Sequence, residues 1–250
     1  MPCFSNMKKE KTTDYGRLIV GTREDLFTTA IKLAVAQQTK VTRKFFSWAL
    51  TGGSTPQEWY RWCVTNRSLP AKLVQGADFT VSDERVVPLH SDQSNFGNAE
   101  RQLFTPFKVP AEHQHAWPVA LLPGEAASTY ARDWHGRAGA DQAYDVCFLG
   151  MGDDGHTASI FPGSPLLKEG DRRLFAAVEV PGKGWRLTIT PAGLGACGLI
   201  LVMTLGASKA AMLKRVLTGP HDPAKTPIQL LRTCSHRVVW LVDTAAAAEL

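Results

Sequence analysis

The sequence lacks any apolar run that approaches the ~20 residues of a membrane-spanning helix. Its beginning, MPCFSNMKKEKTTDYG, also lacks the apolar stretch on which a secretory signal peptide depends. These absences favour a cytoplasmic protein that does not associate with membranes. We expect residues 1–15 to form a flexible tail.

Cysteine is scarce, with five residues in a chain of 250, and no Cys-x-x-Cys pair occurs. An odd number without that spacing does not suggest a disulfide framework or a zinc knuckle. Cys147 and Cys197 lie in apolar runs and are expected to be small core residues. A reduced, cytosolic setting follows.

Acidic residues are outnumbered: 28 Lys and Arg against 23 Asp and Glu leave 28 − 23 = +5 charges, and the isoelectric point is about 9.0. This excess favours an anionic partner. A dense run of Lys and Arg is missing, however, whereas nucleic-acid-binding proteins gather such residues on one face. We therefore expect a small phosphorylated ligand and no nucleic acid.

Apolar strand-like and amphipathic helix-like segments alternate along the rest of the chain. This order predicts an α/β fold with a mostly parallel sheet and helices on both faces. No linker or repeat interrupts it, so residues 16–250 are expected to form one domain. The predicted strands cover 17–20, 44–50, 78–82, 145–149, 186–190, 199–205 and 237–242, and the helices cover 24–38, 57–64, 126–138, a segment after Pro191, 208–217 and 227–232.

The first polar motif, TGGSTP, joins a predicted strand to a predicted helix. Gly52 and Gly53 would let the backbone approach a ligand closely. The hydroxyls of Ser54 and Thr55 and the free N–H groups of the helix could then hold a phosphate. A plain glycine-rich turn with a Ser/Thr cap is the alternative. The motif is no Walker A loop, because Gly-Lys-Ser/Thr is missing.

A second motif, SDERVVP, follows the predicted strand 78–82 and precedes Ser94-Asn95-Phe96. Asp and Glu are costly to bury without partners, so a solvated turn is one interpretation. In the functional interpretation, Arg85 binds an anion through its planar fork of donors. Asp83 then contacts sugar hydroxyls or orients Arg85.

The third motif, GMGDDGHTASIFPG, is the most informative stretch. It contains Gly-x-Gly-x-x-Gly after a strand, but Pro162, Gly163 and Pro165 exclude the long helix of a dinucleotide-binding loop. Asp154 and His156 flank a glycine, so both side chains can enter one cleft. A carboxylate beside a histidine fixes its orientation and raises its basicity, which suits a general base.

Two basic residues could complete a phosphate site. Arg186 lies in the predicted strand 186–190, and Lys209 lies in GASKA after the predicted strand 199–205. Taken alone, each is equally compatible with a solvated charge at the end of an element.

Together these motifs resemble the 6-phosphogluconolactonase family, within a wider group that includes glucosamine-6-phosphate deaminases and ribose-5-phosphate isomerases. The resemblance rests on LTGGSTP, SDERVVPLHSDQSNFGNAE, GMGDDGHTASIFPGS, the Arg186 segment and GASKA, in the family's order. It implies a three-layer α/β/α sandwich of Rossmann-like topology. It also implies hydrolysis of 6-phospho-D-glucono-1,5-lactone in the pentose phosphate pathway, with no metal ion and no organic cofactor.

The resemblance also implies roles for individual residues. His156 would be the catalytic base with Asp154 beside it, and the substrate, chiefly its phosphate, would be bound by Gly52, Gly53, Ser54, Thr55, Asp83, Arg85, Arg186 and Lys209. Two departures are visible. Ile160 replaces the usual leucine, and Ala-Gly-Leu-Gly-Ala at 192–196 stands where the family often has Leu-Asn, which removes a polar contact from that turn.

Two alternatives remain. A glucosamine-6-phosphate deaminase or aldose–ketose isomerase would use the same phosphate site, although the TASIFPG continuation favours the lactonase. A non-catalytic phosphosugar-binding regulator would need a DNA-binding helix-turn-helix, for which the short N-terminal segment leaves no room. We expect a monomer or weak homodimer.

Overall fold

The structure, a computed structural model, describes residues 9–250. Its centre is a seven-stranded sheet in the order β1-β2-β10-β9-β6-β3-β4. All neighbours are parallel except β1, which pairs antiparallel with β2 at one edge. The strands are β1 Lys9–Thr13, β2 Gly16–Gly21, β3 Ser47–Leu50, β4 Asp78–Val81, β6 Val146–Leu149, β9 Leu199–Thr204 and β10 Val238–Asp243. The predicted α/β fold with a mostly parallel sheet is confirmed.

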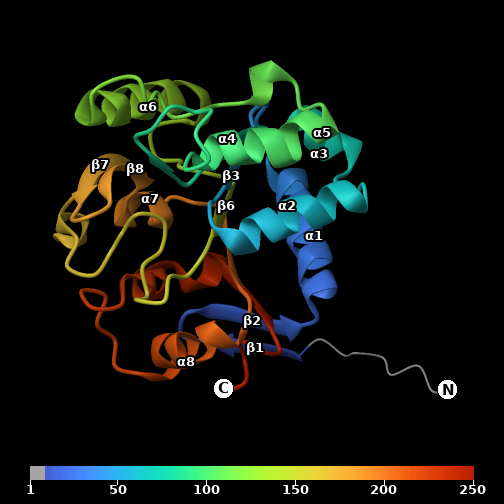
Figure 1. Cartoon of the computed structure of the whole chain (residues 1–250), viewed down its shortest axis with the longest axis vertical. Helices are drawn as coiled ribbons and strands as arrows, with labels where there is room; N and C mark the ends of the chain where they lie inside the picture. Colours follow the sequence, from blue (N-terminus) through green and yellow to red (C-terminus); the bar gives the residue numbers. More distant parts are fainter. Residues whose placement is uncertain (1–8) are drawn as a thin grey trace.

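Helices flank the sheet. In Figure 1, α1 and α2 lie on one side of β3 and β6, and α7 lies on the other side together with β7 and β8. The larger helices are α1 Arg23–Lys40, α2 Ser54–Thr65, α6 Pro123–Ala138 and α8 Ala210–Thr218, and the shorter ones are α3 Ala71–Gly76, α4 Asn95–Ala99, α5 Thr105–Phe107, α7 Pro191–Gly195 and the irregular turns η1 Glu100–Phe104, η2 Ala111–His113, η3 Pro165–Leu167, η4 Ala207–Lys209 and η5 Pro227–Arg237.

A second, three-stranded antiparallel sheet follows the order β5-β8-β7. Its strands are β5 Asp83–Arg85, β8 Gly184–Ile189 and β7 Phe175–Val180. β5 continues almost directly from β4, so a single stretch of chain passes from the main sheet into the small one. The small sheet thereby brings Arg186 opposite Arg85, as paired residues of β8 and β5.

The core explains why these elements form. The β3, β4 and β6 strands are buried at every position, as strands covered on both faces should be. Large aromatic side chains, Trp48 and Trp59 among them, fill the space between sheet and helices in one continuous apolar cluster. Within residues 9–250, no helix is long and apolar enough to cross a membrane.

Two predictions differ from the structure. Lys9–Thr13 form the edge strand β1 where a flexible tail over 1–15 was expected, because their backbone pairs with β2 although their side chains are exposed; residues 1–8 lie outside the described part. The sequence also predicted no strand at Asp83–Arg85 or Phe175–Val180. Cys63, Cys147, Cys197 and Cys234 are buried free thiols, as expected for Cys147 and Cys197.

Candidate active site

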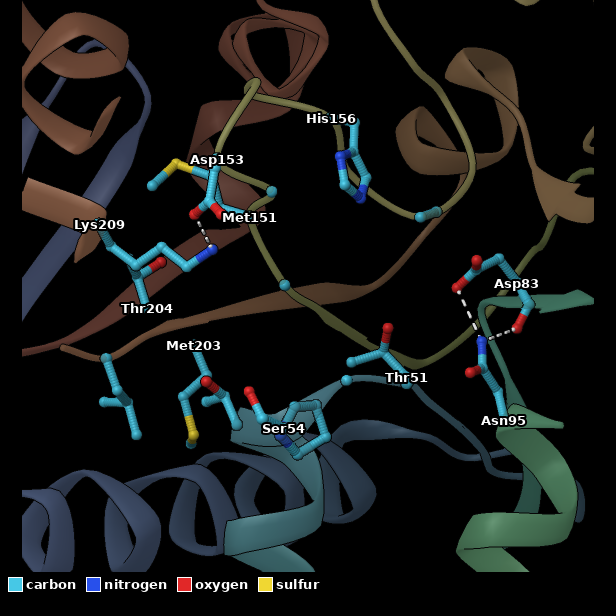
Figure 2. A pocket seen from close by; sticks show the side chains of 18 of the residues that line it. Thr51, Ser54, Asp83, Asn95, Met151, Asp153, His156, Met203, Thr204 and Lys209 are labelled. Carbon is cyan, nitrogen blue, oxygen red and sulfur yellow. Dashed lines mark hydrogen bonds and ion pairs between the residues drawn. The ribbon is translucent and has the colours of Figure 1, made fainter. Parts of the chain in front are cut away.

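The site lies between β3 and β6, where the order in which the chain adds strands to the sheet changes direction. From β3 the chain continues outward to β4, whereas from β6 it continues the other way to β9 and β10. In parallel sheets, ligands bind beyond the carboxyl ends of the strands at such a switch point. Here the loops after β3 and β6 enclose a cavity of about 300 Å³, at the lower end of the ~300–1,000 Å³ range of small-molecule sites. Figure 2 shows this cavity.

The loop after β3 forms one wall. Gly53 is the N-cap of α2 and supplies no side-chain cap, so the first N–H groups of this helix remain available to an anion. Gly52 is required for another reason: a Cβ there would lie 1.9 Å from Oδ1 of Asn95. The Asn95 amide therefore occupies the space that a side chain at position 52 would need.

A buried carboxylate holds Asn95 in place. Glu84 is fully buried and accepts hydrogen bonds from the backbone N–H groups of Arg85, Asn95 and Phe96 and from the Ser94 hydroxyl, at 2.7–2.9 Å. Burial raises the pKa of Glu84, and these four donors act in the opposite direction. Glu84 thus fastens the start of α4 to β5.

Asp83 joins two of the motifs. Its Oδ2 accepts a 2.7 Å hydrogen bond from the Ser159 hydroxyl, and its backbone carbonyl accepts one of 2.8 Å from the Asn95 amide. Ser159 belongs to the loop after β6, 76 residues further along the chain. Asp83 and Asn95 together form the polar end of the cavity shown at the right of Figure 2.

His156 and Asp154 form a hydrogen-bonded pair. The imidazole Nδ1 lies 2.5 Å from Oδ1 of Asp154, which also accepts the backbone N–H of His156 at 3.0 Å. Burial acts to raise the pKa of Asp154, but the hydrogen bonds from His156 outweigh it and the pKa is lowered. Because Nδ1 faces a carboxylate, this geometry favours the neutral tautomer that carries its proton on Nδ1 and leaves the lone pair of Nε2 free.

The imidazole also packs closely against its neighbours. The ring of Phe161 stacks against it with centroids 4.2 Å apart. Gly152 is also close to the ring: a Cβ there would lie 2.0 Å from Nδ1 of His156 and 2.8 Å from Oδ1 of Asp154. Figure 2 shows the imidazole on the wall opposite Thr51 and Ser54. Asp154 and Phe161 therefore fix the ring, and Gly152 leaves the space that it occupies.

Gly152→Ala tests this packing. The added methyl group must displace the imidazole, and misplacement by ~1 Å costs about 10²-fold in rate, so we expect kcat to fall by about that factor. The unfolding temperature should move by only a few degrees, since the obstructing atoms belong to a partly exposed side chain. Steady-state kinetics and thermal unfolding measure both. Gly136→Ala in α6, where a Cβ meets nothing within 4 Å, is the matched control; an unimpaired Gly152→Ala enzyme would contradict the argument.

The loop after β9 brings Lys209 to the opposite end of the cavity. Its Nζ lies 2.6 Å from Oδ1 of Asp153. Asp243, the last residue of β10, supports this loop: its two carboxylate oxygens accept the N–H of Gly206 at 2.9 Å and 3.0 Å. Arg23 in turn contacts the Asp243 carboxylate at 3.3 Å.

Arg85 and Arg186 stand beside each other. Arg85 lines the cavity and donates a 2.6 Å hydrogen bond to the carbonyl of Gln93. Arg186 lies next to it, outside the cavity lining. Burial and the neighbouring Arg85 guanidinium lower the pKa of Arg186. The two positive charges repel each other, so an anion bound between or near the guanidinium groups would stabilise both.

The structure brings most of the predicted site residues to one cavity. Those lining it are Gly52, Gly53, Ser54, Thr55, Asp83, Arg85, His156 and Lys209. Asp154 reaches the cavity only through His156, and Arg186 only through Arg85. Asn95, Asp153 and Glu84 were assigned no role from the sequence. For Glu84, the sequence offered one indication, an acidic residue just after a predicted buried strand. Nothing in the sequence indicates that Asp153 contacts Lys209.

Within residues 9–250, no group of three or more His, Cys, Asp or Glu side chains is arranged to hold a metal ion. The site combines a helix N-terminus, cations and an oriented imidazole at the switch point of a parallel sheet. Fold and site therefore define an α/β protein whose cavity carries the groups expected to bind a small phosphorylated ligand.

Comparison with known proteins places the chain within this class. The family model described as glucosamine-6-phosphate isomerases/6-phosphogluconolactonase matches residues 21–240. The chain belongs to this family. A 6-phosphogluconolactonase of a Nostoc species is 32% identical over 231 residues, 90% of this chain and 91% of the relative. The corresponding protein of a Synechocystis species is 31% identical over 89% of this chain and 90% of its own length.

Solved structures agree with the fold. The 6-phosphogluconolactonase of Trypanosoma brucei matches with a TM-score of 0.77 and 26% identity, over 97% of this chain and 100% of that one. The 6-phosphogluconolactonase of Thermotoga maritima matches with a TM-score of 0.72 and 26% identity, over 94% of this chain and 100% of that one.

Proposed function

We propose that this protein hydrolyses 6-phospho-D-glucono-1,5-lactone to 6-phospho-D-gluconate, the second step of the oxidative pentose phosphate pathway. The observation that carries the proposal is the His156–Asp154 pair, with Nε2 of His156 free, across a cavity from the GGST loop. Relatives over nine tenths of the chain named as 6-phosphogluconolactonases support the choice of substrate.

The phosphate anchors the substrate away from the reacting carbon. Its oxygens are bound by the N-terminus of α2, by Gly52, Gly53, Ser54 and Thr55 and by Lys209, with Arg85 and, behind it, Arg186 adding positive charge. Charge-assisted hydrogen bonds of this kind are stronger and more directional than neutral ones. Binding energy from the phosphate thereby orients the lactone for reaction.

His156 is the general base. Neutral Nε2 takes a proton from water as the water oxygen attacks the C1 carbonyl, and the resulting imidazolium returns the proton to the ring oxygen when the C1–O bond breaks. Asp154 stabilises the imidazolium through Nδ1. Loop N–H groups or a nearby cation stabilise the oxyanion of the tetrahedral intermediate.

The polar end of the cavity selects the sugar. Asp83 and Asn95 carry carboxylate and amide oxygens that can accept hydrogen bonds from lactone hydroxyls. Both side chains are buried and held by neighbours, Asp83 by Ser159 and Asn95 by Asp83. Such preorganised acceptors reject analogues that lack the matching hydroxyl, because a buried acceptor would then stay unpaired.

The direct test is a coupled assay on freshly prepared phosphogluconolactone, in which added 6-phosphogluconate dehydrogenase reports each product molecule. Hydrolysis well above the spontaneous rate supports the proposal. Release of ammonia from glucosamine 6-phosphate would instead identify the deaminase alternative. Binding of the phosphosugar without turnover of either compound would identify a non-catalytic binding protein.

We further propose a cytoplasmic protein that is a monomer or weak homodimer. The location is supported by four buried thiols that form no disulfide among the described residues, which suits a reducing compartment.

A further inference from the structure

Lys209 is paired with a carboxylate of the same chain. Its ammonium, the cation at the α2 end of the cavity, lies 2.6 Å from the carboxylate of Asp153, and both residues line the cavity. The Asp153 side chain is 80% exposed, whereas that of Lys209 is 22% exposed. The acid therefore reaches in from solvent to a cation that the fold holds in the site.

The Asp153 carboxylate and a substrate phosphate would both need the ammonium of Lys209. A phosphate bound at the GGST loop needs the Lys209 charge, and it also carries the same sign of charge as Asp153. An exposed ion pair is worth only ~0–1 kcal/mol, so it can be broken without great cost. Asp153 has room to turn into water, since its carboxylate contacts no other polar side chain within residues 9–250.

We propose that Asp153 is an affinity-setting residue that competes with the substrate phosphate for Lys209, and thereby weakens binding of both substrate and product. The inference rests on the proposed phosphate site and deepens it. Substrate and product carry the same phosphate, so a weaker phosphate grip hastens product release as well as raising KM.

Asp153→Asn removes the charge and keeps the size. We expect 6-phosphogluconate to bind roughly two- to fivefold more tightly in isothermal titration calorimetry, and KM for the lactone to fall by a similar factor, because one competing charge of an exposed pair is lost. Asp153→Glu, which restores a carboxylate within reach of Lys209, should return both values toward the wild type. Asp171→Asn is the matched control: Asp171 forms an equally short 2.6 Å pair with Arg173 away from the cavity.

A double-mutant cycle separates competition from general charge repulsion. In a Lys209→Met background, Asp153→Asn should give a smaller gain in affinity than in the wild type, since the contested ammonium is gone. Unchanged or weaker binding by Asp153→Asn would overturn the inference and make Asp153 a support for Lys209. An equal gain in both backgrounds would also overturn it. Failure of this inference differs from failure of the proposed function, because in the second case the wild-type protein would not hydrolyse the lactone.

Discussion

His156→Ala is expected to lower kcat by about 10²–10⁴-fold, the usual contribution of a positioned general base. His156 lines the cavity, and Asp154 cannot replace it because the Asp154 side chain does not line the cavity. Binding of 6-phosphogluconate should persist, since the cations and the α2 N-terminus are untouched. Steady-state kinetics gives the rate, and calorimetric titration gives the dissociation constant.

His236→Ala is the control for this substitution. His236 is exposed and precedes β10, at the opposite end of the strand from the site, so its loss should leave kcat as it is. An unchanged kcat in His156→Ala would rule out the general-base role. Loss of both rate and product binding would show instead that the loop after β6 had collapsed, which the melting temperature reveals independently.

The lactone without its phosphate, D-glucono-1,5-lactone, is expected to be hydrolysed with kcat/KM lower by about 10²–10⁴-fold. Hydrogen bonds to charged groups contribute ~1.5–3 kcal/mol each, so losing about two of them removes ~3–6 kcal/mol of transition-state binding. Part of the loss should fall on kcat, because the phosphate orients the reacting carbon from a distance. Parallel kinetics on the two lactones measures this ratio.

Lys209→Met gives the internal check. This variant should lose activity mainly on the phosphorylated lactone, so the preference between the two substrates narrows. Equal hydrolysis of both lactones by the wild type would refute the phosphate clamp. If the wild type and Lys209→Met prefer the phosphorylated lactone to the same extent, the phosphate does not bind at Lys209.

The central part of this architecture could be predicted from the sequence because it depends on local patterns. Apolar runs such as LILVMTL mark strands buried on both faces, and polar motifs after them must gather at one edge of a parallel sheet. The break expected from Pro162, Gly163 and Pro165 is also found: in the described residues after β6 the chain makes turns and the short η3 where a dinucleotide-binding loop would continue into a long helix.

The remaining features depend on tertiary contacts. β1 and β5 consist of polar residues, KEKTT and DER, whose strand conformation comes from pairing with a neighbour rather than from hydrophobic alternation. Asn95 enters the site because a buried Glu84 fastens its loop, and Asp153 meets Lys209 56 residues away. β7, with FAAVEV, did carry an apolar pattern that could have identified it.

The hydrogen bond from Ser159 to Asp83 has a consequence for chimaeras made from this chain and a homologue. A crossover point anywhere between these two residues takes the Asp83 carboxylate from one parent and the Ser159 hydroxyl from the other. Such hybrids keep this hydrogen bond only when one parent supplies the carboxylate and the other supplies the hydroxyl at the matching positions. Shuffling experiments should therefore place their junctions before Asp83 or after Ser159.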